Sequence, residues 1–324
     1  MTSPVLTVDN LQTHFFSEKG IVKAVDGVSF DVNRGEVLGL VGESGSGKSI
    51  TGFSILGLID PPGRVIGGRI LFQGQDLVGL SADEMRKLRG RRIAMIFQDP
   101  MMTLNPVLSI GTQMVETVLA HENVSAAEAR ARARDTLGMV GIPSPEERLA
   151  AYPHQFSGGM RQRVAIAIAL LHRPDLIIAD EPTTALDVTI QSQILNQIQS
   201  LSKDLGMALV WITHDLGVVA GLAQRIAVMY AGRIVEIGET NEVLDRSAHP
   251  YTLGLLQSVA ANVPRGAPLK AIPGMAPPPL NRPSGCAFRT RCAFATKICE
   301  TEPVLESAGT QAWRCFHPQA RRAA

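Results

Sequence analysis

One glycine-rich octapeptide has the residue types and the spacing of a phosphate-binding loop. Its letters are GESGSGKS, and they fit the pattern G-x-x-x-x-G-K-[ST]. The glycines permit a tight turn in which successive backbone N–H groups point at phosphate oxygens. Lys48 is expected to reach the β- and γ-phosphates, and Ser49 to ligate Mg²⁺. The residues predicted to bind ATP here are Gly42, Glu43, Ser44, Gly45, Ser46, Gly47, Lys48 and Ser49.

Two acidic residues follow a second apolar run, LIIAD. Asp180 ends this run, where a carboxylate can hold the Mg²⁺ shell of a bound nucleotide. Glu181 comes next, where a carboxylate can orient and deprotonate an attacking water. A strand-end surface acid is the alternative for Glu181. The two letters DE alone do not decide between them, but the surrounding motifs favour a catalytic Glu181.

The stretch FSGGMRQR has the features of a second anion site. Ser157 stands where a helix N-cap belongs, and Gly158 and Gly159 follow it at the start of a helical run. An exposed helix N-terminus with small residues binds anions. A single phosphate loop is enough to bind the phosphates of one ATP molecule, so a second phosphate-binding site in the same chain requires another explanation.

Alternating strands and helices are expected to position these residues. The segments VLTVDNLQTHFF and AVDGVSFDV alternate apolar and polar residues, as half-exposed antiparallel strands do. EVLGLVG is a continuous apolar run that fits a buried central strand. Further strands are expected in RIAMIFQ, DLIIAD, ALVWIT and RIAVMY, and helices in ITGFSILGL, SAAEARARARDTLGMV, GGMRQRVAIAIALLH and TIQSQILNQIQSLSKDLG. This order predicts an α/β fold with a mostly parallel sheet that is covered on both faces.

The composition narrows the class of protein. The chain has 324 residues, 45% of them apolar, and a net charge of +1, which argues against a general polyanion binder such as a nucleic-acid protein. The basic run MRKLRGRR is interpreted as a solvated helix face, with a lipid or nucleic-acid patch as the alternative. No secretory signal and no apolar stretch of membrane-span length is visible, so we expect a cytosolic protein with reduced thiols.

The order of the motifs resembles that of the ATP-binding-cassette (ABC) family, from about Val5 to Leu256. In that family two cassettes stack head to tail, and the signature of one closes on ATP held by the P-loop of the other. The resemblance implies that Ser157, Gly158 and Gly159 contact ATP in trans. It also implies a P-loop NTPase fold with a RecA-like core, an antiparallel β-subdomain and a helical subdomain at about residues 100–160. The nucleotide-binding domain is expected to span residues 1–262.

The resemblance also assigns roles to single residues. Gln98 in IFQDP resembles the Q-loop glutamine, which touches Mg²⁺ and the lytic water. Asp187 in ALD resembles the D-loop residue that crosses the dimer interface, and His214 in WITHD resembles the switch histidine that contacts the γ-phosphate. Phe15 lies in the region of the aromatic that stacks on adenine, but Phe16 is adjacent and leaves that choice open.

The C-terminal part resembles one branch of the family. HPYTLGLL, from His249 to Leu256, precedes a segment with seven prolines between Pro264 and Pro283. This order resembles the oligopeptide and dipeptide importer ATPases, and some nickel importers share it. By itself, HPY also fits a helix start with a buried tyrosine. We expect residues 263–324 to form a proline-rich linker and a small cysteine-rich appendage.

All four cysteines lie in that appendage, at Cys286, Cys292, Cys299 and Cys315. In a reducing compartment such a group suggests a metal rather than disulfides. The resemblance implies a [4Fe–4S] cluster, with zinc as the alternative, although zinc sites usually have closer cysteine pairs. Arg289, Arg291 and Lys297 lie between the cysteines and are expected to favour the thiolate form. We expect the cluster to staple the segment without affecting ATP binding.

The resemblance implies a peripheral ATPase subunit of a bacterial peptide importer at the cytoplasmic face of the membrane. Its expected partners are a second, related ATPase subunit, two transmembrane permease subunits and an extracytoplasmic substrate-binding protein. The alternatives are a nickel-import ATPase, a soluble cassette protein of DNA repair, translation or iron–sulfur assembly, and a P-loop kinase. The signature and His214 argue against the kinase, which needs no phosphate site for a second subunit.

Overall fold

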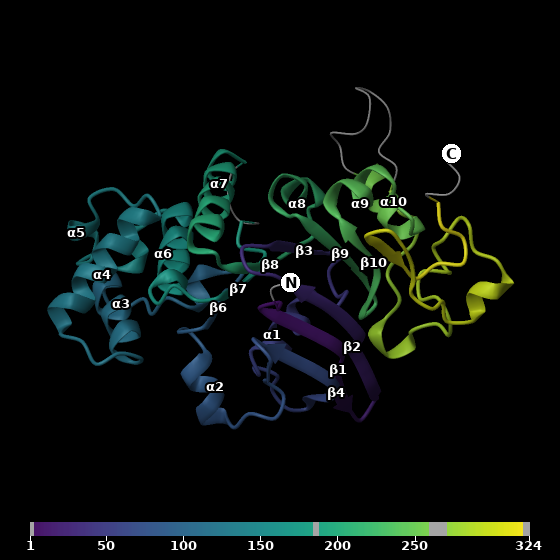
Figure 1. The fold of residues 1–324 in the computed structure, drawn as a ribbon, viewed down its shortest axis with the longest axis horizontal. Coiled ribbons are helices and arrows are strands. Elements are labelled where there is room, and N and C mark those ends of the chain that lie inside the picture. The colour runs from purple at the N-terminus through teal and green to yellow at the C-terminus, as the bar shows by residue number, and fades with distance from the viewer. Residues whose placement is uncertain (1–2, 184–187, 259–270, 320–324) are drawn as a thin grey trace. The chain divides into compact units, whose positions relative to one another are not determined.

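The structure is a computed structural model that describes residues 3–183, 188–258 and 271–319 (Figure 1). Its described residues fall into two compact units. The first unit takes residues from 1–5, 32–36 and 79–210, and the second takes residues from 6–31, 37–78 and 211–324. In the described ranges, no helix is both long and apolar enough to cross a membrane.

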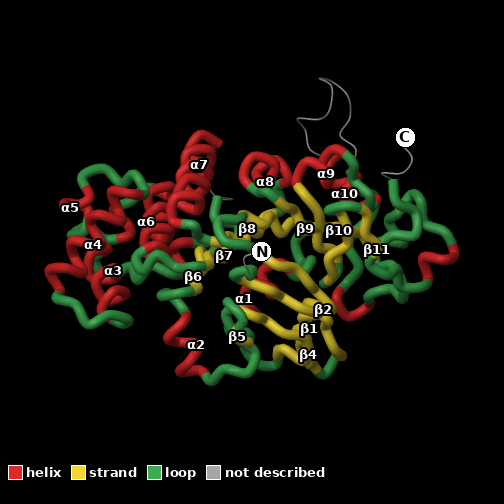
Figure 2. Tube along the Cα trace, in the orientation of Figure 1, coloured by secondary structure: helices red, strands yellow, loops and turns green. Residues whose placement is uncertain are grey.

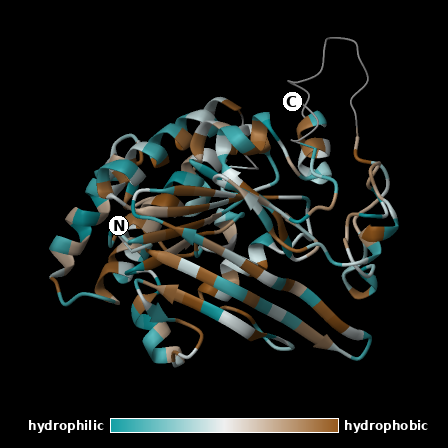
Figure 3. Cartoon of the chain, turned by 45° about the vertical axis from the view of Figure 1, so that its right-hand side comes forward, coloured by the Kyte–Doolittle hydropathy of each residue, from teal (hydrophilic) through white to brown (hydrophobic). Residues whose placement is uncertain are grey.

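An antiparallel sheet lies in the second unit, with strand order β2-β1-β4-β5. Its strands are β1 (Leu6–Ser17), β2 (Gly20–Val32), β4 (Gly63–Phe72) and β5 (Gln75–Asp76). Strands β1 and β4 pair from Leu6 opposite Phe72 to Phe15 opposite Gly63. Hydrophilic and hydrophobic bands alternate along these strands in Figure 3, as expected for strands with one solvated face. The two antiparallel strands predicted in this region are confirmed.

A second set of strands in this unit begins with β3 (Val37–Val41), in which all five residues are buried. Strand β3 pairs in parallel with β9 (Arg225–Tyr230), and β9 pairs antiparallel with β10 (Arg233–Glu239). Beyond β10 follow β12 (Gln311–Trp313) and β11 (Glu306–Ala308), both antiparallel to their neighbours. The helices of the unit are α1 (Lys48–Ile55), α8 (Leu216–Leu222), α9 (Thr240–Asp245) and α10 (Pro250–Gln257), with 3-10 turns at Pro279–Asn281 and Lys297–Glu300.

The first unit combines a parallel strand pair with a group of helices. Strands β6 (Ile93–Ile96) and β7 (Leu176–Asp180) are parallel, and β8 (Ala208–Thr213) starts in this unit. The helices are α2 (Ala82–Leu88), α3 (Ile110–Leu119), α4 (Ala126–Met139), α5 (Pro145–Arg148), α6 (Gly158–Leu170) and α7 (Val188–Leu205), with 3-10 turns at Pro100–Met102 and Pro153–Gln155. Figure 2 shows α3, α4, α5 and α6 joined by loops into one helical cluster. Buried Met114, Ala133 and Leu137 belong to its apolar interior.

The expected cysteine-rich appendage is not supported. The C-terminal strands β11 and β12 continue the strand order beside β10, within the same compact unit as the phosphate loop. These strands have three residues each, too few for a periodic pattern to reveal them in the sequence. The proposed boundary at residues 262–263 lies outside the described residues and stays a prediction.

Candidate active site

The glycine-rich octapeptide forms the loop between β3 and α1, as predicted. Gly47 has φ 104° and caps the helix, and a Cβ atom there would come within 2.3 Å of the Ala24 carbonyl oxygen. A Cβ on Gly42 would come within 2.2 Å of the Met229 carbonyl oxygen. Glycine is therefore required at both ends of the loop, because the backbone passes directly against β2 and β9.

Lys48 lies over the loop that it follows. Its Nζ donates hydrogen bonds of 2.8 Å to the Gly42 carbonyl and 3.0 Å to the Glu43 carbonyl, and the residue is 5% exposed. Helix α1 has no acidic residue in its first turn and no side-chain cap, so its N-terminus suits an anion. The Ser46 hydroxyl is buried without a hydrogen-bond partner in the described chain. This arrangement can bind phosphate oxygens.

The two predicted catalytic residues Gln98 and Glu181 lie together in the first unit. Strand β7 ends at the buried Asp180, and Glu181 follows with φ 45°, a left-handed conformation that is uncommon for a residue with a Cβ. The Gln98 amide donates a hydrogen bond of 3.3 Å to the Glu181 carboxylate. Sequence motifs separated by 83 residues are thus brought to one place.

The signature stretch forms an exposed helix start in the same unit. Ser157 is the N-cap of α6, and its hydroxyl accepts a hydrogen bond of 3.3 Å from the Met160 N–H. Ser157 and Gly158 are exposed, and a Cβ added to Gly158 would meet no atom within 4 Å. The 13-residue helix has no acidic residue in its first turn. The predicted N-cap is confirmed, and its surroundings leave room for an anion.

The remaining predicted residues are His214, Asp187, Phe15 and Phe16. His214 is exposed between β8 and α8 in the second unit. Asp187 lies outside the described residues. Phe15 packs against Gly63, where a Cβ would be 2.5 Å from its ring, and the Arg64 guanidinium lies 4.4 Å from the centre of the Phe16 ring. The choice between Phe15 and Phe16 therefore stays open.

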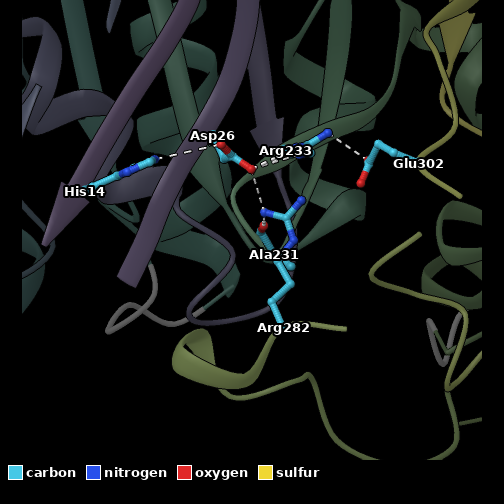
Figure 4. A network of polar contacts seen from close by, with 6 residues as sticks. All are labelled: His14, Asp26, Ala231, Arg233, Arg282 and Glu302. Carbon is cyan, nitrogen blue, oxygen red and sulfur yellow. Dashed lines mark hydrogen bonds and ion pairs between the residues drawn. The ribbon is translucent and has the colours of Figure 1, made fainter. Parts of the chain in front are cut away.

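A network of charged side chains surrounds Asp26 (Figure 4). The Asp26 carboxylate accepts hydrogen bonds from Arg233 at 2.8 and 3.1 Å and from Arg282 at 3.1 Å. Burial raises the pKa of Asp26, but the hydrogen bond and charge of Arg233 outweigh it, and the pKa is lowered overall. The Asp26 N–H donates to the Gly232 carbonyl, and the Gly232 N–H donates to the Ser46 carbonyl. The network therefore connects the described end of the proline-rich segment to the loop.

The four cysteines line one cavity, together with His249 and Phe288. Burial raises the pKa of the Cys286 thiol to about 11 and that of the Cys315 thiol to about 12, and it also raises the pKa of Cys292. The expectation that neighbouring basic residues favour thiolates is therefore wrong. Arg291 pairs instead with the carboxylate of Glu43.

The expectation of a metal centre is not supported by the side-chain arrangement. Over the ranges that the structure describes, no group of three or more His, Cys, Asp and Glu side chains lies where it could hold a metal ion.

Two contacts to Glu43 were missed by the sequence analysis. The Glu43 N–H donates a hydrogen bond of 2.8 Å to the Tyr251 hydroxyl, and its carboxylate binds Arg291. Apart from the family resemblance, the letters HPY fit a helix start with a buried tyrosine, and Tyr251 is indeed at the start of α10 with an exposure of 0%. No local signal connects Arg291 to the loop, because the two residues are 248 positions apart.

A phosphate-binding loop between a buried strand and a helix, with carboxylates at the end of a parallel strand, defines a P-loop nucleoside triphosphatase. Comparisons with known proteins identify the family. Residues 25–184 match the model of the ABC transporter family, and residues 235–299 match that of the oligopeptide/dipeptide transporter C-terminal region. The chain belongs to the dipeptide and oligopeptide branch of the ABC transporter ATP-binding proteins.

Individual relatives are similar in sequence to this chain along nearly its whole length. The dipeptide transport ATP-binding protein DppD of Bacillus subtilis is 51% identical over 91% of this chain and 89% of its own. DppD of Escherichia coli is 48% identical over 97% of both chains, and the oligopeptide transport ATP-binding protein OppD of Bacillus subtilis is 50% identical over 98% of this chain and 90% of its own.

Solved structures confirm the predicted cassette fold. The dimeric structure of MJ0796, a bacterial ABC transporter cassette, has a TM-score of 0.66 at 29% identity and covers 72% of this chain and 98% of its own. The structure of cbiO1 from Clostridium perfringens, part of the ABC transporter complex cbiONQ, has a TM-score of 0.65 at 30% identity and covers 75% of this chain and 92% of its own.

Proposed function

We propose that this chain is the ATP-hydrolysing subunit of a bacterial ABC importer of dipeptides or oligopeptides. The observation that carries the proposal is the phosphate loop, with Lys48 held over its carbonyls at the start of α1, in a chain about half identical to dipeptide transport ATP-binding proteins. The nickel-import and non-transport alternatives have less support, because the relatives described above are dipeptide and oligopeptide transport proteins.

The proposed reaction is the hydrolysis of ATP to ADP and phosphate. Lys48 and the loop N–H groups bind the β- and γ-phosphates, and Ser49, Gln98 and Asp180 hold the Mg²⁺ shell. Glu181 accepts the proton of the attacking water, and the Gln98 amide that contacts its carboxylate orients both. His214 contacts the γ-phosphate, and Phe15 or the adjacent Phe16 stacks on adenine.

The proposed active site is completed by a second cassette. Ser157, Gly158, Gly159 and Asp187 of one subunit contact ATP on the loop of the other. The exposed N-terminus of α6 supports this, as does the dimeric state of the related MJ0796 cassette. The second cassette is a related ATPase subunit, so the pair is a heterodimer.

The other proposed partners are two transmembrane permease subunits and an extracytoplasmic substrate-binding protein. The helices between residues 100 and 160 contact the permeases at the cytoplasmic face of the membrane. ATP binding closes the cassette pair and drives the permeases through these contacts, and hydrolysis resets the pair.

We also propose that the cysteine cavity holds a [4Fe–4S] cluster, with zinc as the alternative. The convergence of Cys286, Cys292, Cys299 and Cys315 on one cavity supports this. So do the Arg289 Nη1 and His249 Nε2 atoms, which belong to residues of the same cavity and have no hydrogen-bond partner in the described chain. The thiols must lose their protons and close in to bind the metal. Protein purified without oxygen should contain about four irons per chain, and Cys292→Ser should lose them; one zinc, or no metal, would contradict the cluster.

Peptide uptake tests the main proposal. The complete importer, purified and reconstituted in vesicles, should take up labelled dipeptide only with ATP and Mg²⁺. Lys48→Ala should abolish uptake, because the phosphates lose their cation. The matched control is Lys203→Ala, which removes an exposed lysine near the end of α7. ATP-driven uptake of Ni²⁺ in place of peptide, or uptake that survives Lys48→Ala, would overturn the proposal.

A further inference from the structure

The second residue of the phosphate loop is held by residues far along the chain. The Glu43 carboxylate receives two hydrogen bonds from the Arg291 guanidinium, of 2.7 Å and 3.0 Å. The Glu43 N–H donates to the Tyr251 hydroxyl at 2.8 Å, and the Glu43 carbonyl accepts from Lys48 at 3.0 Å. All three polar groups of Glu43 are therefore engaged, two of them by the C-terminal part of the chain.

Arg291 is fixed in place on every side. Its Nε donates 3.0 Å to the Pro273 carbonyl, and its Nη1 lies 3.3 Å from the Tyr230 hydroxyl. The guanidinium lies 5.9 Å from the ring centres of both Tyr230 and Phe288, and the side chain is only 5% exposed. A two-pronged pair between an arginine and a carboxylate is among the strongest and most directional hydrogen-bonded contacts, and here the arginine side of the pair is buried.

Arg291 lies within residues 286–299, the segment that contains Cys286, Cys292 and Cys299 and that we name the cysteine segment. Arg291 directly precedes Cys292, which lines the cysteine cavity, and Phe288 of the same segment lies 5.3 Å, ring to ring, from both Tyr230 and Tyr251. The position of Arg291 therefore depends on the packing of this segment against Tyr230 and Tyr251. If the segment undocks, Glu43 loses its cation and leaves an unpaired, half-buried carboxylate within the phosphate loop.

We propose that Arg291 is a positioning residue for ATP binding, through which the docked cysteine segment holds the phosphate loop in its binding conformation. This rests on the proposed function and extends it to regulation of the same site. Two effects act in the same direction. The pair pre-organises the loop, so less freedom is lost when ATP binds, and it neutralises a carboxylate that would repel the phosphates. This proposal departs from the expectation that the cysteine segment leaves ATP binding unaffected, and the measurements below decide between the two.

Coupling of this kind is reciprocal. If docking of the segment strengthens ATP binding, ATP must strengthen docking of the segment by the same factor. Two quantities should therefore change together, the affinity of the loop for ATP and the stability of the docked segment, and each can be measured separately.

The first measurement is the Kd of the full-length chain for a fluorescent, non-hydrolysable ATP analogue with Mg²⁺. Arg291→Gln should raise the Kd about tenfold. Arg291→Lys should fall between it and the wild type, because lysine keeps the charge but cannot form the two-pronged pair. Lys297→Gln, which removes the charge of an exposed lysine in the same segment, should alter the Kd less than about twofold, because no hydrogen bond or ion pair joins this side chain to Glu43 in the described residues.

A double-mutant cycle separates positioning of the loop from a general structural effect. In a Glu43→Gln background, Arg291→Gln should add less than about twofold to the Kd, because its partner is already gone. If Arg291 only supported the fold through Pro273 and Tyr230, its effect would instead multiply with that of Glu43→Gln. If the two substitutions change the Kd by independent factors, the proposal is overturned, even if Arg291→Gln alone binds ATP poorly.

The second measurement is hydrogen exchange in residues 286–299. The analogue should slow exchange there several-fold in the wild type and leave it unchanged in Arg291→Gln, which loses the connection. Equal protection in both chains, or an unchanged Kd in Arg291→Gln, would overturn the proposal. If the wild-type chain itself binds no ATP, the proposed function fails together with the inference; if it binds and Arg291→Gln binds equally well, only the inference fails.

Discussion

At the scale of single residues, the contact between Gln98 and Glu181 is the most informative one in the first unit. Glu181 stands directly after a buried strand, in a backbone conformation that few residues with a Cβ adopt. Such conformations persist only where the surrounding structure enforces them, and they are frequent at functional sites. The Gln98 amide then fixes one oxygen of the carboxylate. A strand-end surface acid needs neither feature, so both observations support the proposed role of Glu181 as general base.

Glu181→Gln tests that role. Glutamine keeps the size and one acceptor but removes the base, so hydrolysis by the complete complex should fall by about 10²–10⁴-fold. ATP should still bind, because the phosphate loop is unchanged. Steady-state phosphate release and analogue binding measure the two effects. Glu306→Gln changes an exposed glutamate in β11 and should leave both near wild type. Turnover within about tenfold of wild type in Glu181→Gln would remove Glu181 from the mechanism.

At the scale of elements, one carboxylate ties together the helical cluster of the first unit. Glu122 follows α3, accepts a hydrogen bond of 2.8 Å from Arg132 of α4, and lies 2.8 Å from the Nδ1 atom of His172, just after α6. The hydrogen bond from Arg132, and then that from His172, lower the pKa of Glu122 to about 2. Glu122 and Arg132 lie between residues 100 and 160, in the part of the chain that we propose contacts the permeases.

The lowered pKa predicts how the stability of this unit depends on pH. A carboxylate whose pKa is lower in the folded state stabilises the fold above its unfolded pKa, here about 4.5, and loses that contribution as the pH falls towards 2. Glu122→Gln should therefore lower the unfolding free energy by about 1 kcal/mol at pH 7. The difference from wild type should shrink steadily below pH 4.5.

Urea unfolding of the full-length chain at several pH values measures this effect. Glu116→Gln is the control, because it changes an exposed glutamate on α3. A deficit in Glu122→Gln that stays constant down to pH 2.5 would show that its cause is not the charge of the carboxylate.

At the scale of the whole molecule, the proposed active site is shared between two cassettes. A site that needs the signature of a second subunit cannot reach its full rate in a lone chain. The isolated chain should therefore hydrolyse ATP slowly, and its rate per chain should rise with protein concentration or with an added partner ATPase. Phosphate release over a hundredfold concentration range, with the oligomeric state checked at each point, measures this. A fast rate in a proven monomer would exclude the shared site.

The features that the sequence predicts are local ones. The loop from Gly42 to Ser49 is eight consecutive residues, and its dihedral needs are met by its own glycines. The N-cap at Ser157 depends on the next three residues, and the buried strands β3 and β7 are continuous apolar runs. These features depend on residues that are close together in the sequence. The elements and the motif residues could therefore be predicted without coordinates.

Only the tertiary structure decides the contacts between residues that are far apart in the sequence. Glu43 pairs with Arg291 across 248 positions, and Asp26 pairs with Arg282 across 256. Arg291 was expected to act on its cysteine neighbours, yet packing places it against the phosphate loop, while burial raises the pKa of the Cys286 thiol. Strands β11 and β12 are too short to carry a period; β12 forms on the edge of β10, and β11 on the edge of β12. An ion pair or a strand pairing depends on which surfaces the folded chain brings together, and neither is encoded in the spacing of residues along one segment.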